Sequence, residues 1–271
     1  MIPVLTGESF QALAEARERG DSTLALSLDL KRSQSVVDLK GSHWQLGTQP
    51  FPYAESWDER SIYHWEKDGF AVAARFTSSL IKLVPTPWGP PTFEIDGIKM
   101  IPSAEESPHE NARRKVDLIR PHGKRILDCC AGLGYFADWC LRGGAGEIAS
   151  FEKNADVLWL RSLNPWSPGP APQLSLTHGD IAKAIVDLPS QSFDAILHDP
   201  PRFAVAGELY SQVFYNELYR VARRKARLFH YTGAPNKVAR GRDLAGEVCA
   251  RLRRAGFTAD KALDGVSAVR P

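Results

Sequence analysis

The sequence lacks the features that mark membrane, secreted or strongly nucleic-acid-binding proteins. Its 34 Lys and Arg residues nearly balance 32 Asp and Glu residues, and a net charge of +2 does not by itself indicate nucleic-acid binding. No uncharged apolar run reaches the roughly 18 residues of a membrane span. The first residues do not have the pattern of a signal peptide. We therefore expect a globular, cytoplasmic protein that does not enter a membrane.

Cysteine is also scarce. The four cysteines are Cys129, Cys130, Cys140 and Cys249, and no two of them have the Cys-x-x-Cys spacing of zinc and redox motifs. A disulfide framework is therefore not expected, and no metal site is predicted. Reduced thiols agree with the expected cytoplasmic location.

Turn and strand patterns divide the chain near residue 104. Residues 1–104 contain a predicted helix over residues 8–18 and several short strand-like runs, among them a hairpin over residues 92–101 that turns at Asp96 and Gly97. Prolines and aromatic residues are dense in this part. The pattern predicts a small β-rich N-terminal domain, which could cap a substrate site.

From residue 105 to residue 271, strand and helix patterns alternate. Strands are expected over residues 125–128, 147–152, 174–177, 193–197 and 226–231, and one of the helices is expected over residues 207–222. Such alternation is typical of a parallel sheet with helices on both faces. The prediction is an α/β fold with a Rossmann-like, seven-stranded, mostly parallel sheet, whose last strand could be antiparallel.

A glycine-rich turn follows the first strand of this domain. Asp128 ends the strand, Gly132 and Gly134 follow, and a helix is expected from Tyr135. Open α/β sheets bind ligands at the carboxyl ends of their strands, and glycine lets the backbone approach a ligand closely. A purely structural turn would have the same residues, so the turn alone decides nothing.

Acidic residues end the next two strands. Glu152 stands eighteen residues after Gly134, where a carboxylate suits the ribose hydroxyls of NAD or of another nucleotide. Asp180 could accept a hydrogen bond from an adenine amino group while Ile181 packs on the ring. Alternatively, Asp180 caps a helix that begins at Ile181.

The fourth strand ends in His198-Asp199-Pro200-Pro201-Arg202-Phe203, the most informative segment of the chain. Two prolines fix the backbone and supply carbonyl oxygens without N–H donors, and Asp199 adds a carboxylate. Such a rigid, acceptor-rich ledge can hold an amine with its lone pair aimed at a methyl donor. The alternative is a turn that merely ends the strand.

In this order, the segments resemble motifs I to IV of class I S-adenosylmethionine-dependent methyltransferases, over roughly residues 105–271. The amino- and RNA-methylating branches are the most similar. Four segments also resemble predicted archaeal-type methyltransferases with an Asp-Pro-Pro-Arg motif: Leu127 to Tyr135, Asn164-Pro165-Trp166-Ser167, His198 to Phe203, and Arg240-Gly241-Arg242-Asp243.

The resemblance implies S-adenosylmethionine as cofactor and S-adenosylhomocysteine as product. On the cofactor side it implies roles for Asp128, Ala131, Gly132, Gly134 and Tyr135 near the methionine part, for Glu152 and Lys153 near ribose and adenine, and for Asp180 and Ile181 at adenine. On the other side, Asp199 and Pro200 would face the methyl acceptor.

Two departures from the family pattern limit what can be said of the acceptor. Cys130 stands where small-molecule methyltransferases commonly have the first glycine of motif I, and Arg202 replaces the aromatic residue that stacks on a flipped base. Arg202 can itself stack on a base, and Phe203 is adjacent. Uracil-C5 methyltransferases share the Asp-Pro-Pro-Arg form but need a cysteine where this chain has His230 and Tyr231, so that chemistry is disfavoured.

Further candidates surround this motif. His198 and His230 could accept a proton, although a buried, hydrogen-bonded histidine is the alternative for each, and Tyr231 could orient the substrate. Pro201, Arg202 and Phe203 are candidate substrate contacts. Arg240 and Arg242 precede a helix and could bind an anionic group, unless they belong to a solvated loop.

Three functional hypotheses remain open. The first is a methyltransferase that acts on a nitrogen of an RNA base or another amine, supported by Asp199-Pro200-Pro201 and by eleven Lys and Arg residues between Arg220 and Arg254. The second is a small-molecule or peptide side-chain methyltransferase acting on nitrogen or sulfur, with a polyamine-synthase-like aminopropyltransferase as a variant. The third is a non-catalytic binding module. The acceptor and the oligomeric state are not identified by the sequence.

Overall fold

The computed structural model describes residues 2–203, 206–233 and 243–271, and these divide into two compact units. Unit 1 consists of Met1–His109 and Trp159–Ser167, and unit 2 consists of Glu110–Leu158 and Pro168–Pro271. Each unit has its own sheets and core, and each is described by itself below.

Unit 1 is built from short antiparallel strands and one helix, α1 (Gly7–Glu18). Its three sheets have the strand orders β1-β6-β7, β2-β3-β4-β5 and β11-β10-β9-β8. The strands are β1 (Val4–Thr6), β2 (Thr23–Leu26), β3 (Ser35–Leu39), β4 (His43–Leu46), β5 (Gln49–Pro52), β6 (Ile62–Glu66), β7 (Gly69–Val72), β8 (Ala74–Phe76), β9 (Leu80–Val84), β10 (Thr92–Ile95) and β11 (Ile98–Lys99). The β-rich character expected of this region is thus observed.

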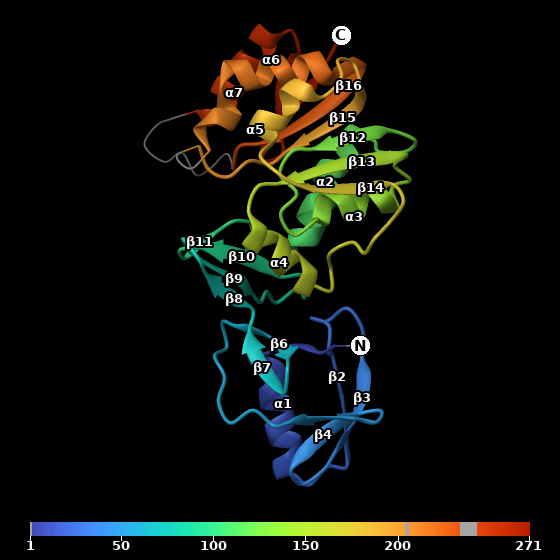
Figure 1. The fold of residues 1–271 in the computed structure, drawn as a ribbon, viewed down its shortest axis with the longest axis vertical. Coiled ribbons are helices and arrows are strands. Elements are labelled where there is room, and N and C mark those ends of the chain that lie inside the picture. Colours follow the sequence, from blue (N-terminus) through green and yellow to red (C-terminus); the bar gives the residue numbers. More distant parts are fainter. Residues whose placement is uncertain (1, 204–205, 234–242) are drawn as a thin grey trace. The chain divides into compact units, whose positions relative to one another are not determined.

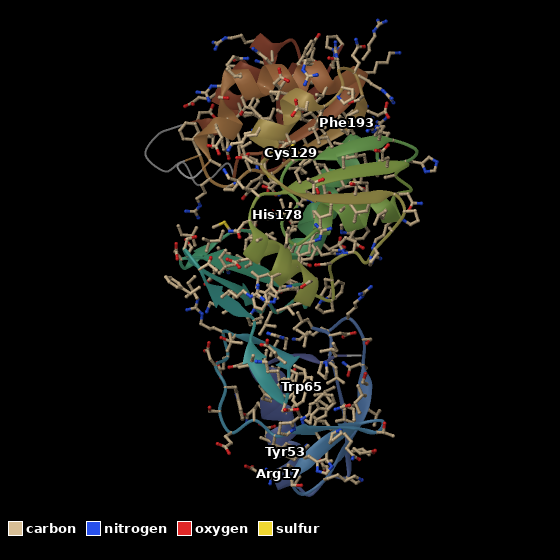
Figure 2. The ribbon with its side chains drawn as sticks, in the orientation of Figure 1. Arg17, Tyr53, Trp65, Cys129, His178 and Phe193 are labelled. Carbon is tan, nitrogen blue, oxygen red and sulfur yellow. The ribbon has the colours of Figure 1, made fainter. Side chains whose placement is uncertain are left out.

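The core of unit 1 is aromatic. Trp44 of β4 and Phe51 of β5 are 0% and 2% exposed, and their rings stack with centroids 4.5 Å apart. Phe10 of α1 packs edge-on against Tyr63 and Phe70. At the surface, the guanidinium of Arg17 lies 4.5 Å from the centroid of the Tyr53 ring (Figure 2 labels both). These aromatic residues therefore stabilise the unit.

The hairpin expected over residues 92–101 is present. Asp96 and Gly97 connect β10 to β11 with positive φ angles of 49° and 75°, which is the backbone of a type I′ turn. The strands β1, β3, β4, β5 and β8 were not expected from the sequence. They have three to five residues each, too few for a clear alternating pattern.

Unit 2 contains the seven-stranded sheet that the sequence predicts. Its order is β14-β13-β12-β15-β16-β18-β17, with β12 (Arg125–Asp128), β13 (Glu147–Glu152), β14 (Leu174–His178), β15 (Phe193–His198), β16 (Ala222–Tyr231), β17 (Thr258–Ala262) and β18 (Gly265–Val269). The five strands β12 to β16 are parallel, and β18 is antiparallel to both β16 and β17. The sheet is therefore mostly parallel, with an antiparallel hairpin at one edge.

Helices cover both faces of this sheet, as expected. They are α2 (Pro108–Ile119), α3 (Tyr135–Arg142), α4 (Ala155–Leu163), α5 (Ile181–Ala184), α6 (Gln212–Val221) and α7 (Leu244–Ala255), with the 3-10 turns η1 (Ile185–Asp187) and η2 (Gly207–Tyr210). Figure 1 shows α5, α6 and α7 on one face and α2 and α3 on the other. Among the described residues, no helix is long and apolar enough to cross a bilayer.

The prediction of a single helix over residues 207–222 is wrong. The segment is split into η2 and α6, because the side chain of Ser211 accepts a hydrogen bond from the backbone N–H of Phe214 and so starts a new helix. The backbone becomes extended at Ala222, and β16 begins there rather than at residue 226.

The strand order brings the carboxyl ends of the parallel strands to one edge. β12 lies between β13 and β15, so the chain leaves β12 and β15 toward opposite sides, which makes this the switch point where open α/β sheets bind ligands. In Figure 2, Cys129 after β12 and His178 at the end of β14 lie toward the same edge, and Phe193 at the start of β15 lies away from them.

Candidate active site at the carboxyl ends of the parallel strands

The loop after β12 needs glycine at two positions. Gly132 and Gly134 have φ angles of 49° and 86°, a conformation that costs most residues with a Cβ about 1–2 kcal/mol. The N–H of Ala131 donates to the carbonyl of Phe151 at 2.8 Å, which ties the loop to β13. Ala131 and Tyr135 are buried, so the loop presents mainly backbone.

Two carboxylates stand next to this loop, and one of them, Glu152, holds its backbone. Asp128 is 1% exposed, and the Ser150 hydroxyl donates to its Oδ2 at 2.7 Å. Glu152 accepts the Gly132 N–H at 2.9 Å on one oxygen and the Asn154 N–H at 2.9 Å on the other. A carboxylate offers about four acceptor positions. Glu152, which is only half-buried, can therefore accept further hydrogen bonds.

Asp180 is the N-cap of α5, which is the alternative that the sequence left open. One of its oxygens accepts the N–H of Ala182 at 3.0 Å, and the other pairs with the ammonium of Lys153 at 2.9 Å. Burial would raise the pKa of Asp180, but these hydrogen bonds bring it below the usual value. Lys153 also lies 3.8 Å from Glu208 of η2, and Ile181 is buried in the core. The cap does not prevent Asp180 from accepting one more hydrogen bond.

The Asp199-Pro200-Pro201 ledge is rigidly supported. The Tyr210 hydroxyl donates to the carbonyl of Pro201 at 3.1 Å, and Phe203 packs edge-on against the Tyr210 ring. Pro200 is buried, Asp199 is half-buried, and Arg202 is exposed. Desolvation raises the pKa of Asp199 to about 6, against the opposing effect of Lys115.

His198 and His230 lie beneath the ledge and do not reach the surface. Both are 0% exposed, and their rings meet edge-on with centroids 4.4 Å apart. His198 Nε2 donates to the carbonyl of Leu209 at 3.0 Å. His230 donates from Nδ1 to the carbonyl of Tyr231 at 2.8 Å and accepts the Tyr215 hydroxyl on Nε2 at 3.0 Å. This geometry fits the alternative of buried, hydrogen-bonded histidines, because neither ring can touch a substrate where it lies.

Burial lowers the pKa of both imidazoles. The pKa of His198 falls to about 4, and that of His230 falls well below its usual value because of burial and the neighbouring His198 ring. Both rings are therefore neutral at pH 7.

Tyr231, at the end of β16, joins two residues that the sequence analysis missed. The ammonium of Lys115, on α2, lies 4.0 Å from the centroid of the Tyr231 ring. It also lies 3.3 Å from Oδ2 of Asp264, in the turn between β17 and β18. Lys115 shares a helix face with Ala112, Val116 and Ile119, so a charge within an apolar stripe was a signal that could have identified it. Asp264 has no comparable signal in the sequence.

Within the part of the chain that the structure describes, the basic residues at the start of β16 lie away from this edge. Arg223, Arg224 and Lys225 are at the start of β16, roughly 20 Å along the strand from Tyr231. Several of these side chains pair with acids, as Arg223 does with Asp194 at 2.9 Å. Arg240 and Arg242, the predicted anion site, lie outside the described residues.

The residues at this edge fit S-adenosylmethionine. α3 has Gly134 at its N-cap, which supplies no side-chain cap, and a helix N-terminus suits the carboxylate of a methionine moiety. Glu152 and Asp180 provide acceptors for hydroxyl and amino groups. The positive φ angles at Gly132 and Gly134 favour glycine, which has no side chain to obstruct a cofactor.

Comparisons with known proteins agree with this fit. The profile of a family described as S-adenosyl-L-methionine-dependent methyltransferase matches residues 147–261. An uncharacterized protein of Methanocaldococcus jannaschii is 42% identical over 220 residues, which are 79% of this chain and 75% of that protein. The ribosomal RNA large subunit methyltransferase I of Photobacterium profundum is 29% identical over 86 residues, which are 31% of this chain and 22% of that enzyme.

Solved structures give a likeness of fold. The spermidine synthase of Thermotoga maritima superposes with a TM-score of 0.57 at 16% identity, over 73% of this chain and 72% of its own. A spermidine synthase bound to the transition state analogue AdoDATO gives a TM-score of 0.59 at the same identity. The chain belongs to one family with the Methanocaldococcus protein, and its match to the profile over residues 147–261 identifies it as an S-adenosyl-L-methionine-dependent methyltransferase.

Proposed function

We propose that this methyltransferase transfers the methyl group of S-adenosylmethionine to a nitrogen of an amine acceptor held at Asp199 and Pro200. The observation that carries the proposal is the Asp199-Pro200-Pro201 ledge, which presents only acceptor groups and is fixed by the Tyr210 hydroxyl at the end of β15. Acceptor groups at this place bind an N–H donor and leave its lone pair free to point elsewhere.

On the cofactor side, we assign the methionine part to the Gly132–Gly134 loop and the start of α3, the ribose to Glu152, and the adenine to Asp180 and Ile181, with Lys153 beside them. When bound, the cofactor supplies a methyl group on a sulfonium. The chain then has to orient the acceptor nitrogen and exclude water, so no strong base is required for a neutral amine. Asp199 would orient the amine and receive its proton.

Part of the basic segment that supported RNA as the acceptor does not lie beside Asp199. Arg223, Arg224 and Lys225, which supported the RNA hypothesis, are at the far end of β16 from Asp199. Electrostatic recognition of a phosphate backbone would need such residues beside the reacting base. The RNA alternative stays a prediction, as do the roles of Arg240 and Arg242, and so does membership of the archaeal-type group with an Asp-Pro-Pro-Arg motif.

Aminopropyl transfer is the second candidate, because the two spermidine synthases share the fold of much of the chain. A group transferred as aminopropyl carries no carboxylate, so its donor would lack the carboxylate of S-adenosylmethionine. The N-terminus of α3, which has glycine at its N-cap, suits a carboxylate and so supports intact S-adenosylmethionine. Calorimetry with the intact and the decarboxylated cofactor separates the two activities, since a methyltransferase should bind the intact form more tightly.

The decisive experiment incubates the protein with methyl-labelled S-adenosylmethionine and a panel of primary amines, polyamines, peptides and RNA. Label should move to an amine, and Asp199→Asn should reduce that transfer at least 100-fold. The matched control is Asp194→Asn, the same change at the opposite end of β15, which should retain transfer. Full activity of Asp199→Asn, or label only in RNA, would overturn the proposal.

A further inference from the structure

Lys115 is the most unusual charged residue near the ledge. Its side chain is 2% exposed, although α2 could direct a lysine to solvent at many other positions. A buried ammonium is costly unless it is paired, because it loses its hydration. The groups around Lys115 must therefore compensate the charge of its ammonium.

The partners of Lys115 come from two other elements. Asp264 Oδ2 lies 3.3 Å from the ammonium, and the Tyr231 ring faces it with its centroid at 4.0 Å. Phe136 and Phe229 follow with centroids at 5.8 and 5.9 Å. The ion pair and the ring faces stabilise the ammonium in this position. Lys115 is therefore fixed at the end of β16, on the same edge as Asp199.

Asp264 is itself held in place and only partly neutralised. Its backbone carbonyl accepts the N–H of Thr232 at 3.1 Å, which anchors the turn between β17 and β18 to the end of β16. Its Oδ1 is buried and has no hydrogen-bond partner among the described residues. Asp199 follows His198, which pairs in register with His230 of β16. Asp199 therefore lies beside the end of β16, where Lys115 meets the Tyr231 ring and pairs with Asp264.

Three neutral groups also lie in the electrostatic surroundings of Asp199. Burial raises the pKa of Cys130 on the glycine loop, of Tyr210 on η2 and of Tyr231 on β16, and the charge of Asp199 contributes to each increase. Asp264 makes ionisation of Asp199 harder, and Lys115 makes it easier. The exposed Arg202 acts on Tyr231. The charge state of Asp199 therefore depends first on its burial, and then on the opposing effects of Lys115 and Asp264.

We infer that Lys115 is a positioning residue for methyl transfer, whose buried ammonium, paired with Asp264 and set against the Tyr231 ring, keeps the Asp199 carboxylate charged. This inference rests on the proposed role of Asp199 for its functional meaning, but the charge effect can be measured without an acceptor. A charged Asp199 can bind and deprotonate an amine, whereas a protonated Asp199 cannot accept its proton.

The test is a pH titration of carboxyl carbons by NMR on the full chain with labelled aspartate, with Asp199→Asn to assign the signal. In the wild-type chain the pKa of Asp199 should be about 6. Lys115→Met should increase the proton affinity of Asp199 by about 10-fold or more, because a nearby buried cation is lost. Lys115→Arg should keep the wild-type titration, since it keeps the charge.

Two further variants separate the effect of the Lys115 charge from a general effect of the substitution on the fold. Lys115→Met leaves Asp264 buried without its cation, so the double variant with Asp264→Asn removes both charges and should return the Asp199 titration toward wild type. Lys124→Met, a partly buried lysine near Asp194 at the other edge of the sheet, is the matched control and should change nothing at Asp199.

An unchanged Asp199 titration in folded Lys115→Met would overturn the inference and leave Lys115 a purely structural ion pair between α2 and the turn. That outcome is independent of the methyl-transfer assay. If Asp199→Asn kept full activity instead, the proposed function would fail while the charge coupling could still be present.

Discussion

Glu152 gives the sharpest single-residue test of the proposed cofactor site. Its two oxygens accept backbone N–H groups of Gly132 and Asn154, so the carboxylate shapes the loop to which the proposal assigns the cofactor. Glu152→Gln should weaken S-adenosylhomocysteine binding about 10- to 100-fold, the usual effect of losing charged hydrogen bonds. Calorimetry measures this directly. Glu208→Gln, beside Lys153 on η2, is the control, and equal losses in both variants would contradict the role of Glu152.

A substitution at Gly134 tests whether the same loop needs a positive φ angle at this position. Its φ angle is 86°, and a Cβ there is strained. Gly134→Ala should reduce the free energy of unfolding by about 1–2 kcal/mol in urea denaturation. Gly169→Ala is the matched control, because Gly169 lacks a positive φ angle and a Cβ there would meet no atom within 4 Å. Similar stability of the two variants would show that the loop relaxes without cost.

At the scale of an element, α5 depends on its cap. The helix has four residues, and Asp180 supplies the side-chain cap through the Ala182 N–H. Asp180→Ala should cost about 1 kcal/mol of stability, because a helix N-cap is lost. Asp180→Asn keeps the cap but loses the Lys153 ion pair, so it should be nearly neutral in stability. If denaturation shows the same loss for both, the ion pair matters more than the cap.

The segment between β15 and α6 shows why element boundaries depend on tertiary contacts. Sequence periodicity over residues 207–222 predicted one helix, since apolar residues recur at helical spacing. In the structure, His198 holds the carbonyl of Leu209 and Arg251 donates to the carbonyl of Tyr210 at 2.7 Å. These long-range bonds occupy acceptors that a continuous helix would use internally. Partners distant in the sequence therefore decided where α6 begins.

At the scale of the whole molecule, the buried histidines make stability depend on pH. The folded pKa of His198 is about 4, below the usual 6.5, because burial disfavours the charged ring. Its stabilising contribution is complete above pH 6.5 and is lost as pH falls toward 4, since only the unfolded chain takes up the proton. The loss should amount to about 3 kcal/mol.

Urea denaturation from pH 7 to pH 4 measures this loss, and His198→Gln should make the pH dependence shallower. Tyr219→Phe, a change in a partly buried side chain of α6, is a control that should keep the wild-type slope. An equally steep loss of stability in His198→Gln would assign the acid sensitivity to other groups, among them His230, whose pKa is also lowered.

The sequence by itself determined the order of strands and helices in the sheet domain and the position of the glycine loop. Strands and helices alternate in short, strongly apolar segments, so β12 to β15 and the glycine loop could be located. The acids at successive strand ends fit a nucleotide, and the family resemblance of these segments implied S-adenosylmethionine. The comparisons with the methyltransferase family agree with that prediction. Such features are local, because each depends on a few neighbouring residues.

Only the tertiary structure decided which side chains meet at the ledge. It buried His198 and His230 beneath Asp199, and it brought Lys115 and Asp264 together from segments about 150 residues apart in the sequence. It also placed Arg223 and Lys225 at the opposite end of β16 from Tyr231. Burial, pairing and distance depend on how the sheet is ordered and covered, and they set the charge of Asp199, which no local pattern of residues contains.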